Sequence, residues 1–336
     1  MTPLLEVRDL YKAFSSRRRF GGAARRVRAV NGVSFEVHEG ETLGLVGESG
    51  CGKSTLARTL MFLEEPTAGE VLFRGEHIHR GEAVRLRRSA QIVFQDPYTS
   101  LPPRMRIRRI VAEPLLIHGL ADKSEIGARV DRLLADVGLK ADVANKFPHQ
   151  LSGGQRQRVG IARALAVQPS LIIADEAVSS LDVSIQAQIL KLMKDLQREH
   201  RLSYVFISHD LGVVKYMSHR IAVMYLGEIV EIAESDELYR RPLHPYTRAL
   251  MSATPSLTRR TNRIVLEGEP PDPARPPTGC EFHPRCPMAQ SICTGEDPEL
   301  YEWLPNRRAA CHFALEEMEG SAVRSPSPQG GEHRAS

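Results

Sequence analysis

Residues 47–54 have the glycines and the lysine of a loop that binds phosphate. They read GESGCGKS and fit the pattern G-x-x-x-x-G-K-[ST], after an apolar run and before a helical pattern that starts near Ser54. Glycines let the backbone turn its N–H groups inward around phosphate oxygens, and the N-terminus of a helix adds partial positive charge. We expect Lys53 to neutralise the outer phosphates and the Ser54 hydroxyl to bind Mg²⁺. A glycine-rich turn without a ligand is the alternative, which the placement between strand and helix disfavours.

Two neighbouring acids supply a second part of the same site. Residues 171–174 form an apolar run that ends in Asp175 and Glu176, and ligands of parallel sheets bind beyond the carboxyl ends of the strands. We expect Asp175 to hold Mg²⁺ through its water, and Glu176 to orient or deprotonate an attacking water. An exposed acidic turn would explain the pair equally well if it stood alone, but a phosphate loop in the same chain favours hydrolysis.

Residues 151–155, with the sequence LSGGQ, predict a second anion site. The Ser152 hydroxyl and the amides of Gly153 and Gly154 lie at the start of a predicted helix, where N–H groups point outward. The loop around Lys53 already surrounds the phosphates from one side. A second protomer can present this second site to the other face of the nucleotide.

Five cysteines are the third chemical feature, and four of them lie close to the C-terminus, at 280, 286, 293 and 311. An odd number excludes a framework in which every cysteine forms a disulfide. Four cysteines in a cytosolic protein indicate metal binding, because thiolates stay reduced there. Structural zinc favours pairs separated by two to four residues, whereas iron–sulfur clusters accept more varied spacing, so the spacing does not identify the metal. Reduced thiols without metal are the alternative, and Cys51 is interpreted as a spacer in the phosphate loop.

Length and composition fit a globular chain. The 336 residues are 42% hydrophobic, which is enough for two modest domains. The net charge of +4 does not require a nucleic-acid partner. No stretch has the length and apolar character of a membrane span or a secretory signal, so we expect a cytosolic protein.

The elements that must position these residues alternate between strands and helices. Alternating or apolar runs predict strands at 33–37, 42–46, 171–174 and 204–207, and helical spacing of apolar residues predicts a helix over 184–199. This alternation predicts a mostly parallel sheet. Residues 221–225 and 228–232 flank Leu226-Gly227, which predicts an antiparallel hairpin at the sheet edge.

Beyond residue 235 the composition changes. The prolines of residues 270–277 predict an extended connector, and the four late cysteines follow it. From about residue 320 the chain has almost nothing to bury, so we expect a disordered tail over 320–336.

Together these motifs resemble, in order and spacing, the nucleotide-binding subunit of ABC transporters over roughly residues 4–235. The resemblance implies an α/β fold: a P-loop NTPase (RecA-like) core with antiparallel edge strands, an inserted helical subdomain at about 96–158, and a small irregular Cys-rich C-terminal extension. The domains expected from it are 1–235 for nucleotide binding, 236–319 for the extension and 320–336 for the tail. Two such subunits sandwich two ATP molecules head to tail in that family.

Site residues are carried over from the family by position. Gln95 and His209 join Glu176 as catalytic residues, Gln95 also contacting Mg²⁺ and His209 binding the γ-phosphate, while Asp182 crosses the dimer interface. Phe14 aligns with an aromatic residue that stacks on adenine, although a lone aromatic residue is as often part of a core. The remaining nucleotide contacts implied by the resemblance are Gly47, Ser49, Gly50, Cys51, Gly52, Lys53, Ser54, Thr55, Asp175, Ser152, Gly153, Gly154 and Gln155.

Residues 94–101, 181–188 and 244–250 and the cysteine extension look like the ATPases of bacterial oligopeptide and dipeptide importers, nearest the second of their two ATPase subunits. That resemblance implies ATP and Mg²⁺ as ligands and a 4Fe-4S cluster on the four cysteines, with zinc as the alternative. It also implies a second, related ATPase subunit, two transmembrane permease subunits and, indirectly, an extracytoplasmic substrate-binding protein, at the cytoplasmic face of the bacterial inner membrane. Glutathione or nickel chelates are alternative substrates. The cysteines concerned are Cys280, Cys286, Cys293 and Cys311.

Two departures from the family pattern remove no catalytic group. Ala177 replaces a proline after Glu176, and Pro102 replaces a common asparagine. A soluble ABC-type ATPase acting on DNA or ribosomes is a rival interpretation, but it predicts a coiled-coil insertion or a second ATPase half. An ordinary P-loop kinase or GTPase leaves residues 151–155 unexplained. The basic run of Arg104, Arg106, Arg108 and Arg109 lacks interleaved aromatic residues, so we expect a solvated face or a membrane-subunit contact rather than a nucleic-acid site.

Overall fold

A parallel sheet lies at the centre of the computed structural model, which describes residues 2–16, 25–95, 100–252 and 264–316. Four strands pair in parallel in the order β6-β7-β8-β3, and β9 pairs in parallel with the other side of β3. The predicted parallel sheet is therefore confirmed. Its strands are β3 (Thr42–Val46), β6 (Ala90–Val93), β7 (Leu171–Asp175), β8 (Ser203–Ile207) and β9 (Arg220–Tyr225).

A second sheet of four antiparallel strands packs against the first. Its order is β2-β1-β4-β5, and its apolar residues share a core with the parallel strands and with the first helix, α1 (Lys53–Leu60). The strand expected at 33–37 is the end of the much longer β2. The bounds are β1 (Leu5–Ser16), β2 (Arg25–Val37), β4 (Ala68–Phe73) and β5 (Glu76–His77).

The hairpin predicted near Gly227 is present, but its predicted place at the sheet edge is wrong. Strand β10 (Glu228–Glu234) pairs with β9 on one side and with β12 (Arg307–Ala309) on the other, and β11 (Tyr301–Leu304) lies outermost. The carboxylate of Glu231 is buried within β10 and accepts hydrogen bonds from the N–H groups of Leu243 at 2.8 Å and His244 at 2.9 Å. Strands β12 and β11 of the C-terminal part thus extend the sheet beyond β10, the strand that the sequence pattern predicted to lie at the edge.

The helix predicted at 184–199 is α7 (Val183–His200). The Asp182 carboxylate caps it by accepting the N–H of Ile185 at 3.0 Å, and Ile189 and Met193 face the core. The other α-helices of the described chain are α2 (Ala83–Ser89), α4 (Ile107–Ile117), α5 (Ile126–Asp136), α6 (Gly153–Leu165), α8 (Leu211–Met217), α9 (Ser235–Arg240), α10 (Pro245–Ser252) and α11 (Ser291–Gly295). Short 3₁₀ turns are η1 (Arg80–Glu82), η2 (Ala141–Asn145), η3 (Pro148–Gln150) and η4 (His283–Arg285).

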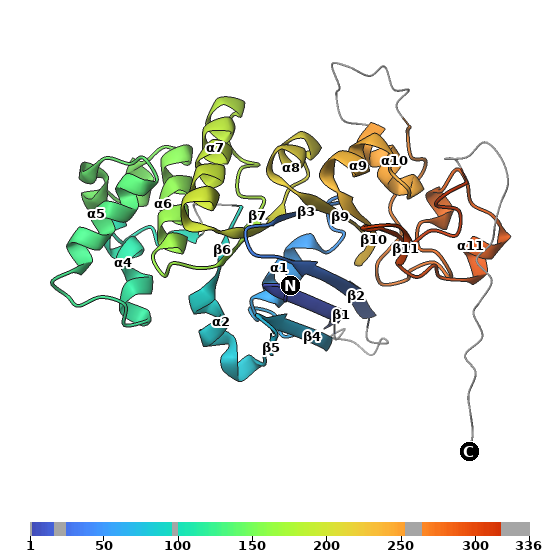
Figure 1. Cartoon of the computed structure of the whole chain (residues 1–336), viewed down its shortest axis with the longest axis horizontal. Helices are drawn as coiled ribbons and strands as arrows, with labels where there is room; N and C mark the ends of the chain where they lie inside the picture. The colour runs from blue at the N-terminus through green and yellow to red at the C-terminus, as the bar shows by residue number, and fades with distance from the viewer. Residues whose placement is uncertain (1, 17–24, 96–99, 253–263, 317–336) are drawn as a thin grey trace.

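Figure 1 places two groups of elements at opposite ends of the core. Helices α4, α5 and α6, in green, lie at one end and share an apolar core that includes Ile110, Val130 and Val159. The C-terminal extension, in orange and red, lies at the other end, beside β10. Its proline-rich segment at 270–277, all of it within the described chain, forms neither helix nor strand, as predicted. The predicted disordered tail at 320–336 lies outside the described residues.

The carboxyl group of Glu228, the first residue of β10, should make the stability of the protein depend on pH. Burial, with the nearby Asp297 carboxylate as the second cause, raises the pKa of Glu228 from 4.5 to about 7. Between these two values the folded chain holds a proton that the unfolded chain has released, so stability falls as the pH rises through this window.

Glu228→Gln should therefore raise the free energy of unfolding above pH 7 by up to about 3 kcal/mol, and the gain should vanish as the pH falls to 4.5. The glutamine keeps an oxygen for the hydrogen bond donated by the Asn31 side chain. Urea unfolding at pH 5 and pH 8 measures the effect, with Glu234→Gln at the exposed end of the same strand as the control. A gain of equal size at both pH values would contradict the prediction.

Candidate active site

The phosphate loop connects β3 to α1 through a backbone that only glycine allows at two points. A Cβ atom on Gly52, whose φ is +109°, would lie 2.0 Å from the carbonyl oxygen of Ala29, and one on Gly47 would lie 2.2 Å from that of Met224. Neither carbonyl can give way easily because both belong to strands. The glycines predicted to cradle phosphate are thus also required by the close approach of the neighbouring backbone.

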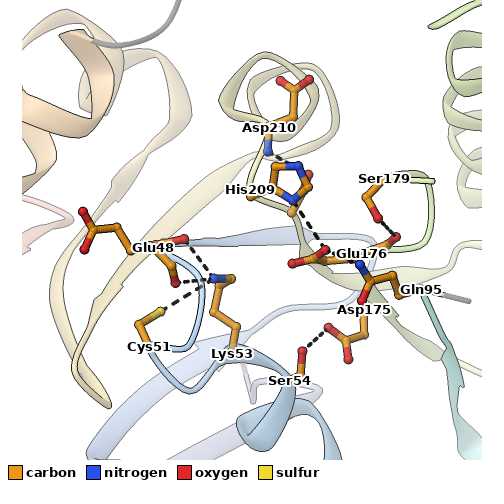
Figure 2. Close-up of polar contacts among 12 residues, drawn as sticks. Glu48, Cys51, Lys53, Ser54, Gln95, Asp175, Glu176, Ser179, His209 and Asp210 are labelled. Atoms are coloured by element: carbon orange, nitrogen blue, oxygen red, sulfur yellow. Dashed lines mark hydrogen bonds and ion pairs between the residues drawn. The ribbon is translucent and has the colours of Figure 1, made fainter. Parts of the chain in front are cut away.

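Lys53 is the first residue of α1, and its side chain is buried inside the loop. Its Nζ donates hydrogen bonds to the carbonyl oxygens of Gly47 at 2.8 Å and Glu48 at 2.9 Å (Figure 2). The Cys51 thiol lies 3.7 Å from the same Nζ, and burial raises the pKa of this thiol. The ammonium group is held at the loop, where phosphate oxygens can replace the carbonyls.

Ser54 and Asp175 meet across the loop and fit a magnesium ion. The Ser54 hydroxyl donates to a carboxylate oxygen of Asp175 at 2.9 Å. Burial raises the pKa of Asp175, the Ser54 hydrogen bond opposes this rise, and the adjacent Glu176 adds to it. The buried Asp175 carboxylate and the Ser54 hydroxyl together offer the hard oxygen donors that Mg²⁺ prefers.

Gln95, Glu176 and His209, the three residues predicted to be catalytic, lie close together. They follow β6, β7 and β8, so their side chains extend from the carboxyl ends of three parallel neighbours. The Gln95 amide donates to Glu176 Oε2 at 2.8 Å, and His209 Nδ1 lies 3.4 Å from the same oxygen (Figure 2). One carboxylate oxygen is therefore the meeting point of all three predicted catalytic side chains.

The backbone of Glu176 is strained. Its φ is +49°, in the left-handed region that a residue other than glycine rarely adopts. Its N–H donates to the Ile207 carbonyl at 3.0 Å, and its own carbonyl accepts the Ser179 hydroxyl at 3.0 Å. These two hydrogen bonds fix the turn that orients the Glu176 carboxylate. They do so although Ala177 stands where the family usually has a proline.

A cavity of about 300 Å³ joins these elements. Five of its lining residues were not found from the sequence: Val27, Arg28, Ala29, Leu226 and Pro273. They lie on β2, at the β9–β10 turn and in the proline-rich segment, and they carry no local motif, so only the tertiary fold brings them there. The predicted residues that line it are Ser49, Gly50, Cys51, Gly52, Lys53, Ser54, Thr55, Gln95 and Glu176.

Phe14 is not among the described lining residues. It lies on β1, pairs with Val27 across the sheet, and carries the Lys12 ammonium 4.8 Å from its ring centre. Its ring is 41% exposed, so it is available to a ligand but is one strand removed from the cavity wall.

Residues 151–155 also lie apart from the cavity, none of them belonging to its described lining. Ser152 caps α6 in a reciprocal arrangement with Gln155: the Gln155 N–H donates to the Ser152 hydroxyl at 3.3 Å, and the Ser152 N–H donates to the Gln155 side chain at 3.1 Å. Gly153 and Gly154 are the first two residues of α6, so their N–H groups lie at the N-terminus of this helix.

The four late cysteines line one small cavity of about 20 Å³ together with His244 and Phe282. All four are free thiols, and burial raises the pKa of Cys280 to about 12 and that of Cys311 to about 11. Among the described residues, no three His, Cys, Asp or Glu side chains lie close enough together to hold a single metal ion.

Known proteins with related sequences cover almost the whole chain. An oligopeptide transport ATP-binding protein of Bacillus subtilis, AppF, is 52% identical over 322 residues, which is 92% of this chain and 97% of the relative. A di/tripeptide transport ATP-binding protein of Pseudomonas aeruginosa, DppF, is 49% identical over 94% of this chain and 98% of its own length. This chain belongs to the oligopeptide/dipeptide branch of the ABC transporter ATP-binding proteins.

Both family patterns support the assignment. The pattern described as ABC transporter matches residues 30–179, and the one described as oligopeptide/dipeptide transporter, C-terminal region, matches residues 230–293. ABC ATP-binding proteins of this branch are ATPases, so the chain is an ATP-hydrolysing enzyme.

Solved ABC structures share the fold. CbiO1 of Clostridium perfringens, part of the transporter complex cbiONQ, superposes with a TM-score of 0.61 at 28% identity over 71% of this chain and 92% of that one. The ATP-binding cassette MJ0796, solved as a dimer bound to ADP and Pi, gives a TM-score of 0.60 at 30% identity over 69% of this chain and 98% of that one. The P-loop NTPase fold expected from the sequence is confirmed.

Proposed function

We propose that the chain hydrolyses ATP to energise the import of peptides by an ABC transporter. The observation that carries this proposal is the convergence of Gln95 and His209 on one oxygen of Glu176, beside the phosphate loop. The peptide-transport names of relatives that are about half identical and of matching length support the substrate class. Glutathione or nickel chelates are the alternative cargo.

Each step of the proposed hydrolysis can be assigned to residues of this chain. Lys53 would exchange its two carbonyl partners for the outer phosphate oxygens. Ser54 and Asp175 would hold Mg²⁺, which would supply positive charge against the phosphates. Glu176 accepts the proton of the attacking water, and Gln95 orients that water from the same side. His209, whose Nδ1 lies 3.4 Å from the same carboxylate oxygen, would bind the γ-phosphate.

We expect ATP to bind between two ATP-binding subunits that together form a dimer. Because residues 151–155 do not line the chain's own cavity, the second anion site acts on the nucleotide of another subunit. A related second ATPase is the expected partner, with Asp182 at the interface. The division into a nucleotide-binding domain at 1–235, a helical subdomain at about 96–158 and an extension at 236–319 belongs to this proposal.

Two permease subunits and an extracytoplasmic binding protein complete the proposed transporter, with this chain at the cytoplasmic face of the inner membrane. No helix in the described part of the chain is long and apolar enough to span a bilayer. Part of the basic run at 104–109 is engaged within the helical elements: Arg108 pairs with Asp131 at 3.0 Å, and Arg106 lies over the Phe147 ring at 5.0 Å. These contacts favour a structural or permease-facing role over nucleic-acid binding.

Purification of the tagged chain from its native membrane tests the proposal. We expect recovery of two multi-span membrane proteins and a second ATP-binding protein, and peptide-stimulated ATP hydrolysis when the binding protein is added to the reconstituted complex. Recovery with ribosomes or DNA repair factors would refute the transport assignment.

We also propose an iron–sulfur cluster at the four late cysteines. Four thiols that line one cavity match in number the four thiolates of a four-iron cluster, one on each iron, and zinc is the alternative. Cys280, Cys286, Cys293 and Cys311 would be the ligands.

Anaerobically purified protein should be brown, with absorbance at about 400 nm from thiolate-bound iron–sulfur clusters. Cys311→Ser should lose most of this absorbance and of the bound iron, whereas Cys51→Ser should keep both. Iron analysis and absorption spectra before and after exposure to air measure the result. A colourless protein with four titratable thiols at 280, 286, 293 and 311 would contradict the cluster and leave the ATPase assignment standing.

A further inference from the structure

Glu48, the second residue of the phosphate loop, is held by two side chains of the C-terminal extension. Arg285 donates two parallel hydrogen bonds to its carboxylate, at 2.8 Å and 3.1 Å. The Glu48 N–H donates to the Tyr246 hydroxyl at 2.8 Å. Both the side chain and the amide of one loop residue are therefore fixed by residues about two hundred positions later in the chain.

The remaining polar group of Glu48 connects these contacts to the phosphate-binding lysine. Its carbonyl oxygen accepts a hydrogen bond from Lys53 Nζ at 2.9 Å. Figure 2 shows the Glu48 carboxylate pointing away from Lys53. Glu48 thus takes no direct part in charge neutralisation at the site and instead joins the loop to the extension.

The Arg285–Glu48 pair has the features of an ion pair that fixes geometry. The Arg285 side chain is 7% exposed and that of Glu48 is 28% exposed. A bidentate guanidinium–carboxylate pair sets both distance and orientation. Removing one partner of such a buried pair is costly, because the other charge is left without compensation.

The position of Arg285 depends on the cysteine loop, residues 280–293. Arg285 ends the short turn η4 directly before Cys286, and its N–H donates to the Phe282 carbonyl at 3.0 Å. Phe282 is buried against the rings of Tyr246 at 5.5 Å and Tyr225 at 5.3 Å between centroids. The residues that hold Glu48 are therefore packed together as part of the cysteine loop and its supporting core.

We infer that Arg285 is a positioning residue for the phosphate loop, which links the affinity for ATP to the folded state of the cysteine loop. The inference rests on the proposed ATP-binding function of that loop. Arg285 holds Glu48, and Glu48 holds the backbone from which Lys53 reaches the phosphates. By reciprocity, bound ATP also stabilises the cysteine loop.

Arg285→Gln, in the full chain, should weaken ATP binding about tenfold, which is within the usual range of coupling between two sites. The matched control is Arg307→Gln: the Arg307 side chain is also 7% exposed and pairs with Glu237 at 3.5 Å, but it has no described contact with the phosphate loop. The control should change the dissociation constant less than about twofold. A fluorescent ATP analogue with Mg²⁺ measures binding, and the hydrolysis rate should show a raised KM with a smaller change in kcat.

Two further measurements separate positioning from general loss of stability. Glu48→Gln combined with Arg285→Gln should weaken binding no more than the Arg285 substitution alone, because both remove one interaction. Hydrogen exchange of residues 280–293 should slow on ATP binding in the wild type and not in Arg285→Gln.

Three outcomes overturn the inference: unchanged affinity in Arg285→Gln, an equal loss in Arg307→Gln, or additive effects of the two substitutions at 48 and 285. Failure of the wild-type chain to bind ATP would instead refute the proposed function itself.

Discussion

Replacing Glu176 by glutamine should lower the steady-state rate of ATP hydrolysis by about 10²- to 10⁴-fold while leaving ATP bound. The amide has the size of the carboxylate but cannot accept a proton from the attacking water. Its oxygen can still accept the hydrogen bond from Gln95, so the geometry of the site is kept. Phosphate release in the steady state, together with retention of labelled ATP, measures the effect.

Glu125→Gln is a suitable control for this substitution. Glu125 is an exposed residue at the start of α5 and pairs only with the exposed Arg129 in the described chain, so its loss should leave the rate unchanged. ATP-bound dimers should accumulate in Glu176→Gln and be separable by gel filtration. Turnover near the wild-type rate in Glu176→Gln would exclude this residue as the general base.

Gly52→Ala should reduce ATP affinity by more than about a hundredfold, because the new methyl group has no room. Its Cβ would lie 2.0 Å from the Ala29 carbonyl oxygen, and the φ of +109° is unfavourable for alanine. The loop must then move away from β2, which takes Lys53 and Ser54 with it. Equilibrium binding of an ATP analogue tests this, with circular dichroism to confirm that the chain is folded.

Gly40→Ala isolates the steric part of that effect. Gly40 also has a positive φ, +74°, but nothing lies within 4 Å of a Cβ placed there, and it belongs to the turn before β3. Gly40→Ala should lower the free energy of unfolding by about 1–2 kcal/mol and leave the affinity for ATP unchanged. Equal loss of binding in both variants would mean that backbone strain, and not the contact with Ala29, restricts position 52.

The phosphate loop and the acid pair of the candidate site were predictable because their signals are local. A glycine-rich turn between β3 and α1 and an acid pair at the end of β7 each occupy a few consecutive positions. Gln95 and His209 carry no signal of their own and were placed only through the family resemblance. In the structure both side chains contact one carboxylate oxygen of Glu176.

Contacts between distant parts of the chain were not predictable in the same way. Arg285 and Glu48 are 237 residues apart, and neither the sequence spacing nor the charge pattern connects them. Val27 to Ala29 reach the nucleotide cavity because β2 crosses the phosphate loop, which depends on how two sheets pack. The place of β10 inside the sheet was missed because β12 has three residues, two of them arginine, and resembles no apolar strand.

That short strand has a consequence for the solubility of shortened forms of the protein. Strand β12 pairs with Glu231 and Ile232 in the middle of one side of β10. Strand β10 has seven residues, and its buried apolar residues are Ile229, Val230, Ile232 and Ala233. A chain that ends before residue 300 would present this edge to solvent, where strands of other molecules can pair with it and build aggregates. Strands β11 and β12 therefore protect this edge of the sheet against self-association.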